Sequence, residues 1–384
     1  LEWQKEMASG GFLDVYIPDV LPGNRLIDLF PLDILYFGIA DMAAVVHYGI
    51  YIPAALITYF SYLLQKINHH IFPNVDGLMQ NIQLVTDHLK KVLRGKVENV
   101  DKHTLTIISC KDGKRYHHDA QGNFWRVFVL LDNVKSYDIV ETYQQAYSGG
   151  RAFGQFQKQL STLDAREIVE VLPNFHNIDF RLNNLKSAVV ANKANRLLEV
   201  QDILDFIDSR EERMRTILRM AENGELPLRI THNDTKFNNV LLDENDEVQC
   251  VIDLDTVMPG YVAYDFGDAI RTIINSAAED EKDLSQIVLN IPLYQAYAEG
   301  YLEEARDFLT EKEIESLFYG VLLLPFMQAV RFLTDYIEGD TYYKIHYIDH
   351  NLVRTRAQMK LFQELEAHES QLKEILNNSL SIEQ

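Results

Sequence analysis

Hydrophobic and polar positions in the first third of the chain predict a small mixed domain. Residues 61–67 have the composition of a strand that ends at a lysine, and residues 78–92 carry apolar side chains at helical spacing. Residues 105–109 and 124–131 flank a Lys-Asp-Gly-Lys turn and form a hairpin-like pair of strands. The predicted order is therefore strand, helix and two further strands.

After residue 136 the pattern changes to long amphipathic helices. These are predicted over residues 139–162, 193–224, 311–339 and 353–380. The change places a boundary near residue 132, between an N-terminal domain, 1–131, and a mainly helical C-terminal domain, 132–384.

One stretch, residues 42–65, has no charged side chain and is long enough to suggest a membrane span. Gly49 and Pro53 interrupt it, and its Tyr, Ile, Val and Thr residues are typical of buried strands. We expect buried strands and turns here, with a membrane segment as the alternative. The first residues, LEWQKEM, lack the basic start and apolar run of a signal peptide, so a cytoplasmic protein is expected.

The amino-acid composition limits the kinds of molecule that the protein is expected to bind. Of 384 residues, 47% are hydrophobic and 24% charged, which is typical of a globular protein, and the formal net charge is −21. Such a surface repels nucleic acid, although a nucleotide can still bind where Mg²⁺ and local cations surround its phosphates. Cys110 and Cys250 form no metal-ligand cluster and are expected as small buried hydrophobes in a reducing cytoplasm.

The segment with the most chemical information is THNDTKFNNVLLDENDEVQCVID, residues 231–253. In it His232-x-Asp234-x-x-x-x-Asn239 precedes an aliphatic run, and Asp253 follows fourteen residues later. Phosphoryl transfer needs one carboxylate to orient the attacking hydroxyl, together with an amide and a second carboxylate to hold Mg²⁺. We therefore interpret the chain as a kinase, with Asp234 as the base and Asn239 and Asp253 as metal ligands.

Three neighbours complete this predicted site. Lys236 is placed to stabilise charge on the transferring phosphoryl group. His232 is grouped with these catalytic residues, although it is expected to hold the loop by hydrogen bonds more than to take part in the chemistry. Asp255 would share a face with Asp253 in an extended stretch, and could bind a second metal or the acceptor.

These residues carry a family resemblance. HNDTKFNNVLLD and VIDLDTVMPGYVAYDFGDAIR resemble the aminoglycoside phosphotransferase-like family, closest to its N-acetylhexosamine 1-kinase group. Further segments similar to that group are YLLQKINHHIF, NFWRVF, LPNFHNIDFR, AVRFLTDYIEGD and HNLVRTR. The resemblance implies an α+β, protein-kinase-like, two-lobed fold with a small mixed β-sheet N-lobe and a mainly helical C-lobe. It also implies ATP and Mg²⁺ as cofactors, and Asp265 as a structural anchor of the catalytic loop.

Nucleotide contacts are expected from the N-terminal domain. Lys66 ends its strand where a kinase keeps the lysine for the α- and β-phosphates, with Asp76 or Asp87 as its partner in place of the usual glutamate. Backbone groups at Val129, Leu130 and Leu131 are expected to pair with adenine. The family's glycine-containing phosphate loop is absent at residues 54–59, so no contact is predicted from residues 1–58.

Acceptor contacts are expected from polar groups among apolar ones. Phe175, His176 and Asn177 offer an aromatic face and two hydrogen-bonding groups. Arg331 lies in the apolar run VLLLPFMQAVRFLTDYI, where a guanidinium needs a ligand or a partner such as Asp335. Arg181 and Arg271 are weaker candidates.

The resulting expectation is a small-molecule kinase that transfers the γ-phosphoryl group of ATP to a sugar. The anomeric hydroxyl of N-acetylglucosamine or N-acetylgalactosamine is preferred on the resemblance. Choline, homoserine or aminoglycoside phosphorylation is the alternative, and a nucleotide-binding pseudokinase is a rival of another class. No nucleic-acid or membrane partner is expected, and the protein is expected to be a monomer or weak dimer.

Overall fold

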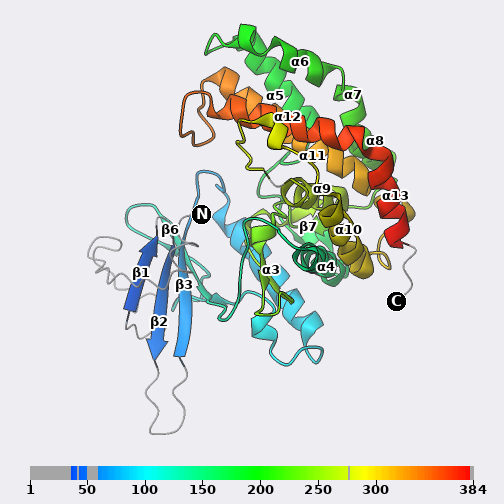
Figure 1. The fold of residues 1–384 in the computed structure, drawn as a ribbon. Helices are drawn as coiled ribbons and strands as arrows, with labels where there is room; N and C mark the ends of the chain where they lie inside the picture. Colours follow the sequence, from blue (N-terminus) through cyan, green and yellow to red (C-terminus); the bar gives the residue numbers. More distant parts are fainter. Residues whose placement is uncertain (1–35, 41–42, 50–58, 276, 381–384) are drawn as a thin grey trace. The chain divides into compact units, whose positions relative to one another are not determined.

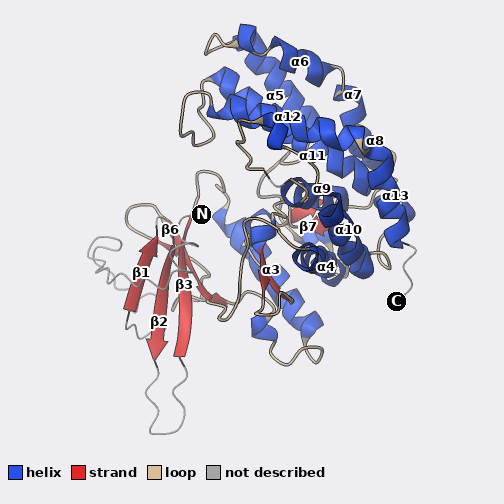
Figure 2. Cartoon of the chain, in the orientation of Figure 1, coloured by secondary structure: helices blue, strands red, loops and turns tan. Residues whose placement is uncertain are grey.

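A computed structural model of the protein describes residues 36–40, 43–49, 59–275 and 277–380. The chain divides into two compact units, residues 1–134 and 135–384. The sequence pattern placed the boundary after residue 131. Figures 1 and 2 show that the large sheet belongs to the first unit and most helices to the second.

The first unit contains an antiparallel sheet of six strands in the order β1-β2-β3-β6-β4, with β5 also paired to β6. Leu64 of β3 lies opposite Val127 of β6, and both side chains are buried. The predicted pairing of residues 105–109 with 124–131 is confirmed, because β4 pairs with β6. The strands are β1 (Tyr36–Ala40), β2 (Ala43–Gly49), β3 (Tyr59–Ile67), β4 (Ile107–Ile108), β5 (His117–His118) and β6 (Phe124–Val129).

Helix α3 (Val75–Leu93) is the predicted helix of this unit. Asn74 caps it, since its side-chain oxygen accepts a hydrogen bond from the N–H of Gly77 at 2.9 Å. The apolar stripe Leu78, Ile82, Val85 and Leu89 is buried, as the helical spacing predicted.

The second unit is mainly helical. Two two-stranded sheets of this unit matter for the site: β7 (Arg229–Thr231) pairs with β10 (Met258–Gly260), and β8 (Val240–Leu242) pairs with β9 (Val248–Val251). The helices are α4 (Tyr143–Leu160), α5 (Ile178–Ala191), α6 (Gln201–Asp208), α7 (Glu211–Met214), α8 (Thr216–Glu222), α9 (Val262–Ile273), α10 (Ile291–Ala305), α11 (Glu311–Glu338), α12 (His350–Ala367) and α13 (Glu369–Leu380).

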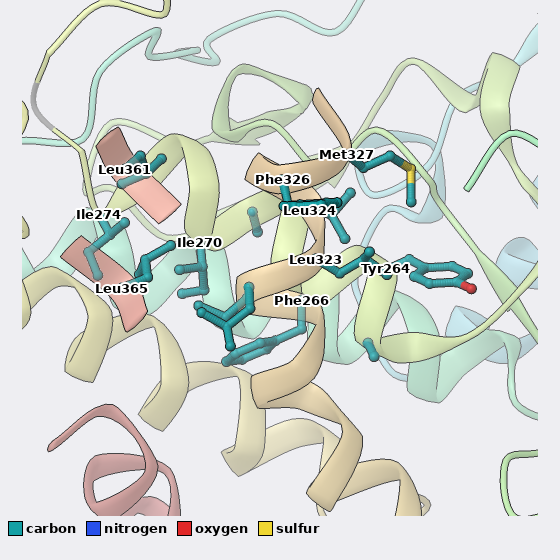
Figure 3. Packing of buried hydrophobic residues seen from close by; sticks show 14 of the residues in the cluster. Tyr264, Phe266, Ile270, Ile274, Leu323, Leu324, Phe326, Met327, Leu361 and Leu365 are labelled. Atoms are coloured by element: carbon teal, nitrogen blue, oxygen red, sulfur yellow. The ribbon is translucent and has the colours of Figure 1, made fainter. Parts of the chain in front are cut away.

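Helix α11 is the central helix of this unit. A capping box starts it, in which Thr310 and Glu313 bond each other's backbone N–H groups, and Gly339 ends it with φ of 99°. It packs against α5, α9 and α12. Figure 3 shows side chains of α9, α11 and α12 that meet in this core, among them Phe266, Leu323 and Leu361.

Two helix pairs approach so closely that only glycine fits. On α9 and α11, an added methyl at Gly267 would overlap the carbonyl oxygen of Gly320. On α4 and α10, a methyl at Gly150 would overlap the carbonyl oxygen of Tyr297. Residues of α4 and α9 belong to the same hydrophobic core. The close packing of this core fixes the positions of both helices, which contact the loop described below.

Two helix predictions need correction. The stretch 193–224 is not one helix but α6, α7 and α8, broken at Ser209–Arg210 and at Arg215. Ile203 of α6 and Met214 of α7 are buried on either side of the first break. The stretch 353–380 is divided at His368 into α12 and α13.

The uncharged stretch 42–65 is described only in part. Its described residues belong to β2 and β3, as the strand prediction expected, and residues 42 and 50–58 lie outside the described part. Residues 54–58, where the family's phosphate loop would be expected, lie outside it as well. Among the described residues, α11 alone is long and apolar enough to cross a membrane, and 78% of its most apolar window is buried inside the unit. This burial is that of a core helix.

Candidate active site

The predicted motif lies in the loop that follows β7. Thr231 ends this strand opposite Met258 of β10, and its hydroxyl donates to the carbonyl oxygen of Met258 at 3.1 Å. Asn233 then takes the left-handed conformation, with φ of 64°, which asparagine tolerates better than most residues. Its side-chain amide donates to the carbonyl oxygen of Thr256 at 3.0 Å. The turn is thereby tied to the segment around Asp255.

His232 is buried and holds the loop, as predicted. Its Nδ1 accepts from the backbone N–H of Asp234 at 3.3 Å, so Nε2 carries the proton that bonds the carbonyl oxygen of Ile252 at 2.8 Å. The rings of Phe153 and Phe156 meet the imidazole edge-on. These contacts fix the start of the loop but leave no nitrogen of His232 for proton transfer, so its assignment to the catalytic group is wrong.

Asp265 of α9 holds the same loop by hydrogen bonds to its backbone, which confirms the anchor role predicted for it. Its carboxylate accepts the backbone N–H of His232 at 2.8 Å and that of Asn233 at 2.7 Å. It also accepts from the Gln157 amide at 2.8 Å, and Tyr301 in turn donates to Gln157. Burial raises the pKa of Asp265. A buried carboxylate needs such donors, and the loop supplies two of them.

Asp234 lies at the partly exposed tip of this loop. Its side chain is 26% exposed, and Oδ1 lies 3.3 Å from Nζ of Lys236, whose own side chain is 47% exposed. The Asn239 amide donates to the backbone oxygen of Asp234 at 2.8 Å and to Oδ2 at 3.2 Å. Asp234 raises the pKa of Lys236, so the lysine is a cation at neutral pH. The structure therefore brings Asp234, Lys236 and Asn239 together.

Asp253 is brought to the same place by the β8–β9 pairing. Val240 lies opposite Val251, and the N–H of Ile252 donates to the carbonyl oxygen of Asn239 at 2.9 Å. Asp253 follows directly, exposed and left-handed with φ of 59°. Asp255 lies two residues on, in the turn Leu254–Thr256, and is half-buried.

These residues fit a magnesium ion that also takes phosphate oxygens. Both hydrogen bonds of the Asn239 side chain leave from Nδ2, so its Oδ1 is left for a cation. Mg²⁺ prefers oxygen ligands and often takes only one or two from the protein. In the described part of the chain no three His, Cys, Asp or Glu side chains cluster as metal ligands.

In the first unit, Lys66 lies near the end of β3 opposite Trp125, with Nζ 6.0 Å from the indole ring. The partners suggested for it are engaged elsewhere. Asp76 accepts the Tyr116 hydroxyl at 2.7 Å, and Asp87 accepts the Gln83 amide at 2.6 Å. Within the described residues Lys66 makes no ion pair.

The predicted adenine-binding backbone follows β6. Val129 ends this strand, and its N–H already donates to the carbonyl oxygen of Thr106 at 2.9 Å. That group is therefore not available to adenine, which corrects the prediction for the N–H of Val129. Leu130 and Leu131 come directly after the strand and stay as predicted contacts.

Of the predicted acceptor residues, three lie together. Arg331 of α11 lies over the ring of Phe175 at 5.4 Å, and Phe175 meets His176 edge-on at 4.6 Å. Asn177 is instead the N-cap of α5, since its Oδ1 accepts from the N–H of Phe180 at 3.0 Å. Its side chain is used for folding, so its acceptor role is wrong.

The suggested pairing of Arg331 with Asp335 is also wrong. Asp335 accepts three backbone N–H groups, from Thr341, Tyr342 and Tyr343, at 2.8–2.9 Å. Arg331 donates to the side-chain oxygen of Gln328 at 2.7 Å.

One pair near the loop escaped the sequence analysis. Asp268 is buried, and Arg271 bonds it at 2.9 Å one helical turn away on α9. Burial opposes the charge of Asp268, but Arg271, Lys236 and His176 together lower its pKa. Only the spacing of three residues in the sequence could have indicated the pair.

Several solved structures have a fold similar to that of this chain. An aminoglycoside phosphotransferase from Alicyclobacillus acidocaldarius is 11% identical with a TM-score of 0.59, over 95% of this chain and 98% of that one. A choline kinase from Cryptosporidium parvum is 13% identical with a TM-score of 0.52, over 94% and 97%. An ethanolamine kinase from Plasmodium vivax is 12% identical with a TM-score of 0.50, over 95% and 96%. This likeness is one of fold, and it confirms the predicted α+β, protein-kinase-like class.

The family assignment rests on the sequence itself. Residues 108–311 match the phosphotransferase enzyme family, APH. The matched range contains the whole loop from His232 to Asp253 together with Asp265. Because the match spans more than half of the chain, the protein belongs to the phosphotransferase enzyme family and is a phosphotransferase, as its sequence predicted.

Proposed function

We propose that the protein transfers the γ-phosphoryl group of ATP to a hydroxyl group of a small molecule. The observation that carries this proposal is the arrangement of Asp234, Asn239 and Asp253. Asn239 bonds Asp234 directly, and the Ile252 N–H bonds Asn239 just before Asp253. A carboxylate beside an amide and a second carboxylate is the set that in-line phosphoryl transfer uses.

In this proposal Asp234 orients the attacking hydroxyl and accepts its proton as the new oxygen–phosphorus bond forms. The transition state is loose, so orientation contributes more than basicity. Lys236, 3.3 Å from Asp234, keeps a positive charge beside the transferring group. The leaving ADP takes the electron pair of the broken bond.

Asn239 through Oδ1 and Asp253 through its carboxylate would hold Mg²⁺, which supplies positive charge to the nucleotide phosphates. Asp255 is kept as a proposed ligand of a second ion. Lys66, Leu130 and Leu131 are kept as proposed nucleotide contacts of the first unit.

For the acceptor we propose the anomeric hydroxyl of an N-acetylhexosamine. The proposal rests on the segments similar to the N-acetylhexosamine 1-kinase group, and the joint position of Phe175, His176 and Arg331 supports it. The solved structures of similar fold are named for aminoglycosides, choline and ethanolamine, so these acceptors are the alternatives to be tested. We further propose a cytoplasmic monomer or weak dimer.

The acceptor test measures ATP consumption with Mg²⁺ across N-acetylglucosamine, N-acetylgalactosamine, choline, homoserine and kanamycin. Phosphorus NMR then gives the position of the new phosphate. A sugar 1-phosphate is expected. Turnover with only another acceptor would show that this acceptor, and not the N-acetylhexosamine, is the substrate. ATP binding without turnover on any acceptor would favour a pseudokinase.

The site is tested by Asp234→Asn, which keeps the size of the side chain but cannot accept the proton. We expect turnover to fall by about 10²–10⁴-fold, the usual contribution of a positioned acid or base, with ATP affinity nearly unchanged. Asp208→Asn, at an exposed position of α6, is the matched control. Asp253→Ala should mainly abolish Mg²⁺-dependent nucleotide binding. Near-normal turnover in Asp234→Asn would show that another group is the base.

A further inference from the structure

Two guanidinium groups from α5 and α11 meet at Phe175. The two helices pack side by side (Figure 1). Arg331 of α11 lies over the Phe175 ring at 5.4 Å and over the Tyr343 ring at 5.6 Å. Arg181 of α5 donates from Nη2 to the backbone oxygen of Phe175 at 2.7 Å. We call Arg181, Arg331, Phe175, His176 and Tyr343 the arginine cluster.

Neither arginine of the cluster is neutralised. Among the described residues no carboxylate lies within ion-pair distance of Arg181 or Arg331, and their bonds go to a carbonyl and to the Gln328 amide. Burial and then the charge of Arg331 lower the pKa of Arg181 to about 10. Two half-buried like charges are costly without a ligand, which indicates that the cluster binds one.

The cluster also contains polar atoms that lack a partner in the described part of the chain. Nδ1 of His176 and the hydroxyl of Tyr343 are both buried without a hydrogen bond. His176 donates from Nε2 to the backbone oxygen of Asn233 at 3.2 Å, so its Nδ1 is an acceptor. A ligand at the cluster would therefore meet two charged donors, one hydroxyl and one acceptor.

His176 places this cluster beside the loop that carries Asp234. The residue that it bonds, Asn233, immediately precedes Asp234. The carboxylates that approach from α9 and its following loop are already paired. Asp268 is bonded by Arg271 at 2.9 Å, and Glu279 by Arg271 at 3.1 Å with Arg354 at 4.0 Å. The side of the catalytic loop toward α5 and α11 is therefore positive, although the whole chain carries a net charge of −21.

We propose that Arg181 and Arg331 select the acceptor by charge: they bind an acetamide or carboxylate oxygen of the acceptor and repel cationic acceptors. An acetamide and a carboxylate both present this oxygen, so an N-acetylated amino sugar and a sugar acid are the two possible sources. A free amine at the same place would face two guanidinium groups. This inference rests on the proposed function, and it disfavours aminoglycosides and choline as acceptors.

The test uses glucose and three sugars that each differ from it at one group: N-acetylglucosamine and glucosamine at C2, and glucuronic acid at C6. Binding is measured by ligand-observed NMR without nucleotide, at a pH at which the amine of glucosamine is protonated. The wild type should bind N-acetylglucosamine or glucuronic acid about tenfold more tightly than glucosamine, the effect of about one charge-assisted hydrogen bond. The preferred member of the pair decides between acetamide and carboxylate.

Variants then test the two arginines. Arg331→Gln and Arg181→Gln should each weaken the preferred sugar about tenfold while leaving glucosamine unchanged or better bound. Arg331→Lys keeps the charge and should keep the rejection of glucosamine. Arg166→Gln, at an exposed position outside the cluster, is the matched control. Circular dichroism confirms that each variant is folded before its binding is compared.

Several results would overturn the inference. These are glucosamine binding as tightly as N-acetylglucosamine and glucuronic acid, no measurable binding of any of the four sugars, or an unchanged order in folded Arg331→Gln and Arg181→Gln. Turnover is measured separately with ATP. If the binding order holds but no acceptor is phosphorylated, the proposed function fails while the charge selection stands.

Discussion

At the scale of single residues, the catalytic loop depends on side chains placed beneath it. Asp265 binds the N–H groups of His232 and Asn233, and His176 binds the carbonyl oxygen of Asn233. Three backbone groups immediately before Asp234 are thus held by buried side chains. Asp234, the proposed base, is therefore positioned by Asp265 and His176 as well as by its own contacts.

His176 gives a prediction for the pH dependence of stability. Burial lowers its pKa to about 4, below the value of about 6.5 in the unfolded chain. Between these values the unfolded chain binds the proton and the folded one does not, so stability falls as the pH falls. This contribution is fully present above about pH 6.5, and about 2 kcal/mol of it is lost between pH 7 and pH 5.

The measurement is urea unfolding of the wild type and of His176→Gln at both pH values. Glutamine can still donate to the Asn233 oxygen but does not titrate. Other histidines and carboxylates titrate alike in both proteins, so the difference between the two free energies isolates His176. A difference that stays constant from pH 7 to pH 5 would mean that His176 is protonated as easily in the folded protein.

The residues of the site that could be predicted are those adjacent in sequence. Asp234, Asn239 and Asp253 lie within one strand–turn–strand stretch, so local pairing brings them together. Phe175, His176, Arg181 and Arg331 were named only as separate candidates. Their meeting could not be predicted, because they come from α5, α11 and the segment before α5, which lie far apart in the sequence. The spacing of Arg331 and Asp335 suggested a pair within one helix, but the chain after α11 binds Asp335 first.

At the scale of elements, periodicity predicts helices that bury one face and misses those that bury most of their surface. Helix α3 has a clean stripe and was predicted nearly to its ends. Helices α9 and α10 were not predicted. On α9, every residue from Val262 to Arg271 is buried, so no exposed face marks the helical period. Helix α10 does carry polar residues at helical spacing, Gln295, Glu299 and Glu303, and the sequence analysis missed them.

The contact of α9 with α11 gives a prediction at this scale. Gly267 and Gly320 let the two backbones touch, and α9 carries Asp265 two residues before Gly267. Gly267→Ala must push the helices apart, so we expect a loss of about 1–3 kcal/mol in the free energy of unfolding. We also expect a lower turnover, since Asp265 would move from the loop that it holds.

Urea unfolding and steady-state kinetics measure both effects. Val190→Ala, at a position of α5 that is 89% exposed, is the control and should stay within about 0.5 kcal/mol of the wild type. Wild-type stability in Gly267→Ala would show that the helices can separate freely. A destabilised variant with normal turnover would show that the loop does not depend on the position of α9.

At the scale of the whole molecule, the proposed chemistry is divided between the two units. The hydrophobic cluster from Val140 to Leu376 belongs wholly to the second unit, and so do the Asp265 network and the arginine cluster. The proposed nucleotide contacts Lys66, Leu130 and Leu131 belong to the first. The change from a mixed to a helical sequence pattern lies between the nucleotide contacts and the residues of the second unit, because each unit has its own periodicity and its own core.

A fragment of residues 135–384 should therefore fold on its own and lack activity. We expect a helical circular-dichroism spectrum and one cooperative urea transition, because the described core of the second unit is contained in the fragment. The fragment should bind the sugar that the full chain prefers, since both arginines are present. It should consume no ATP, because the nucleotide contacts are missing.

The full chain, prepared in parallel, is the reference. A fragment without a cooperative transition would show that the second unit needs the first to fold, and a fragment that hydrolyses or transfers from ATP would show that the nucleotide is held by residues 135–384 alone.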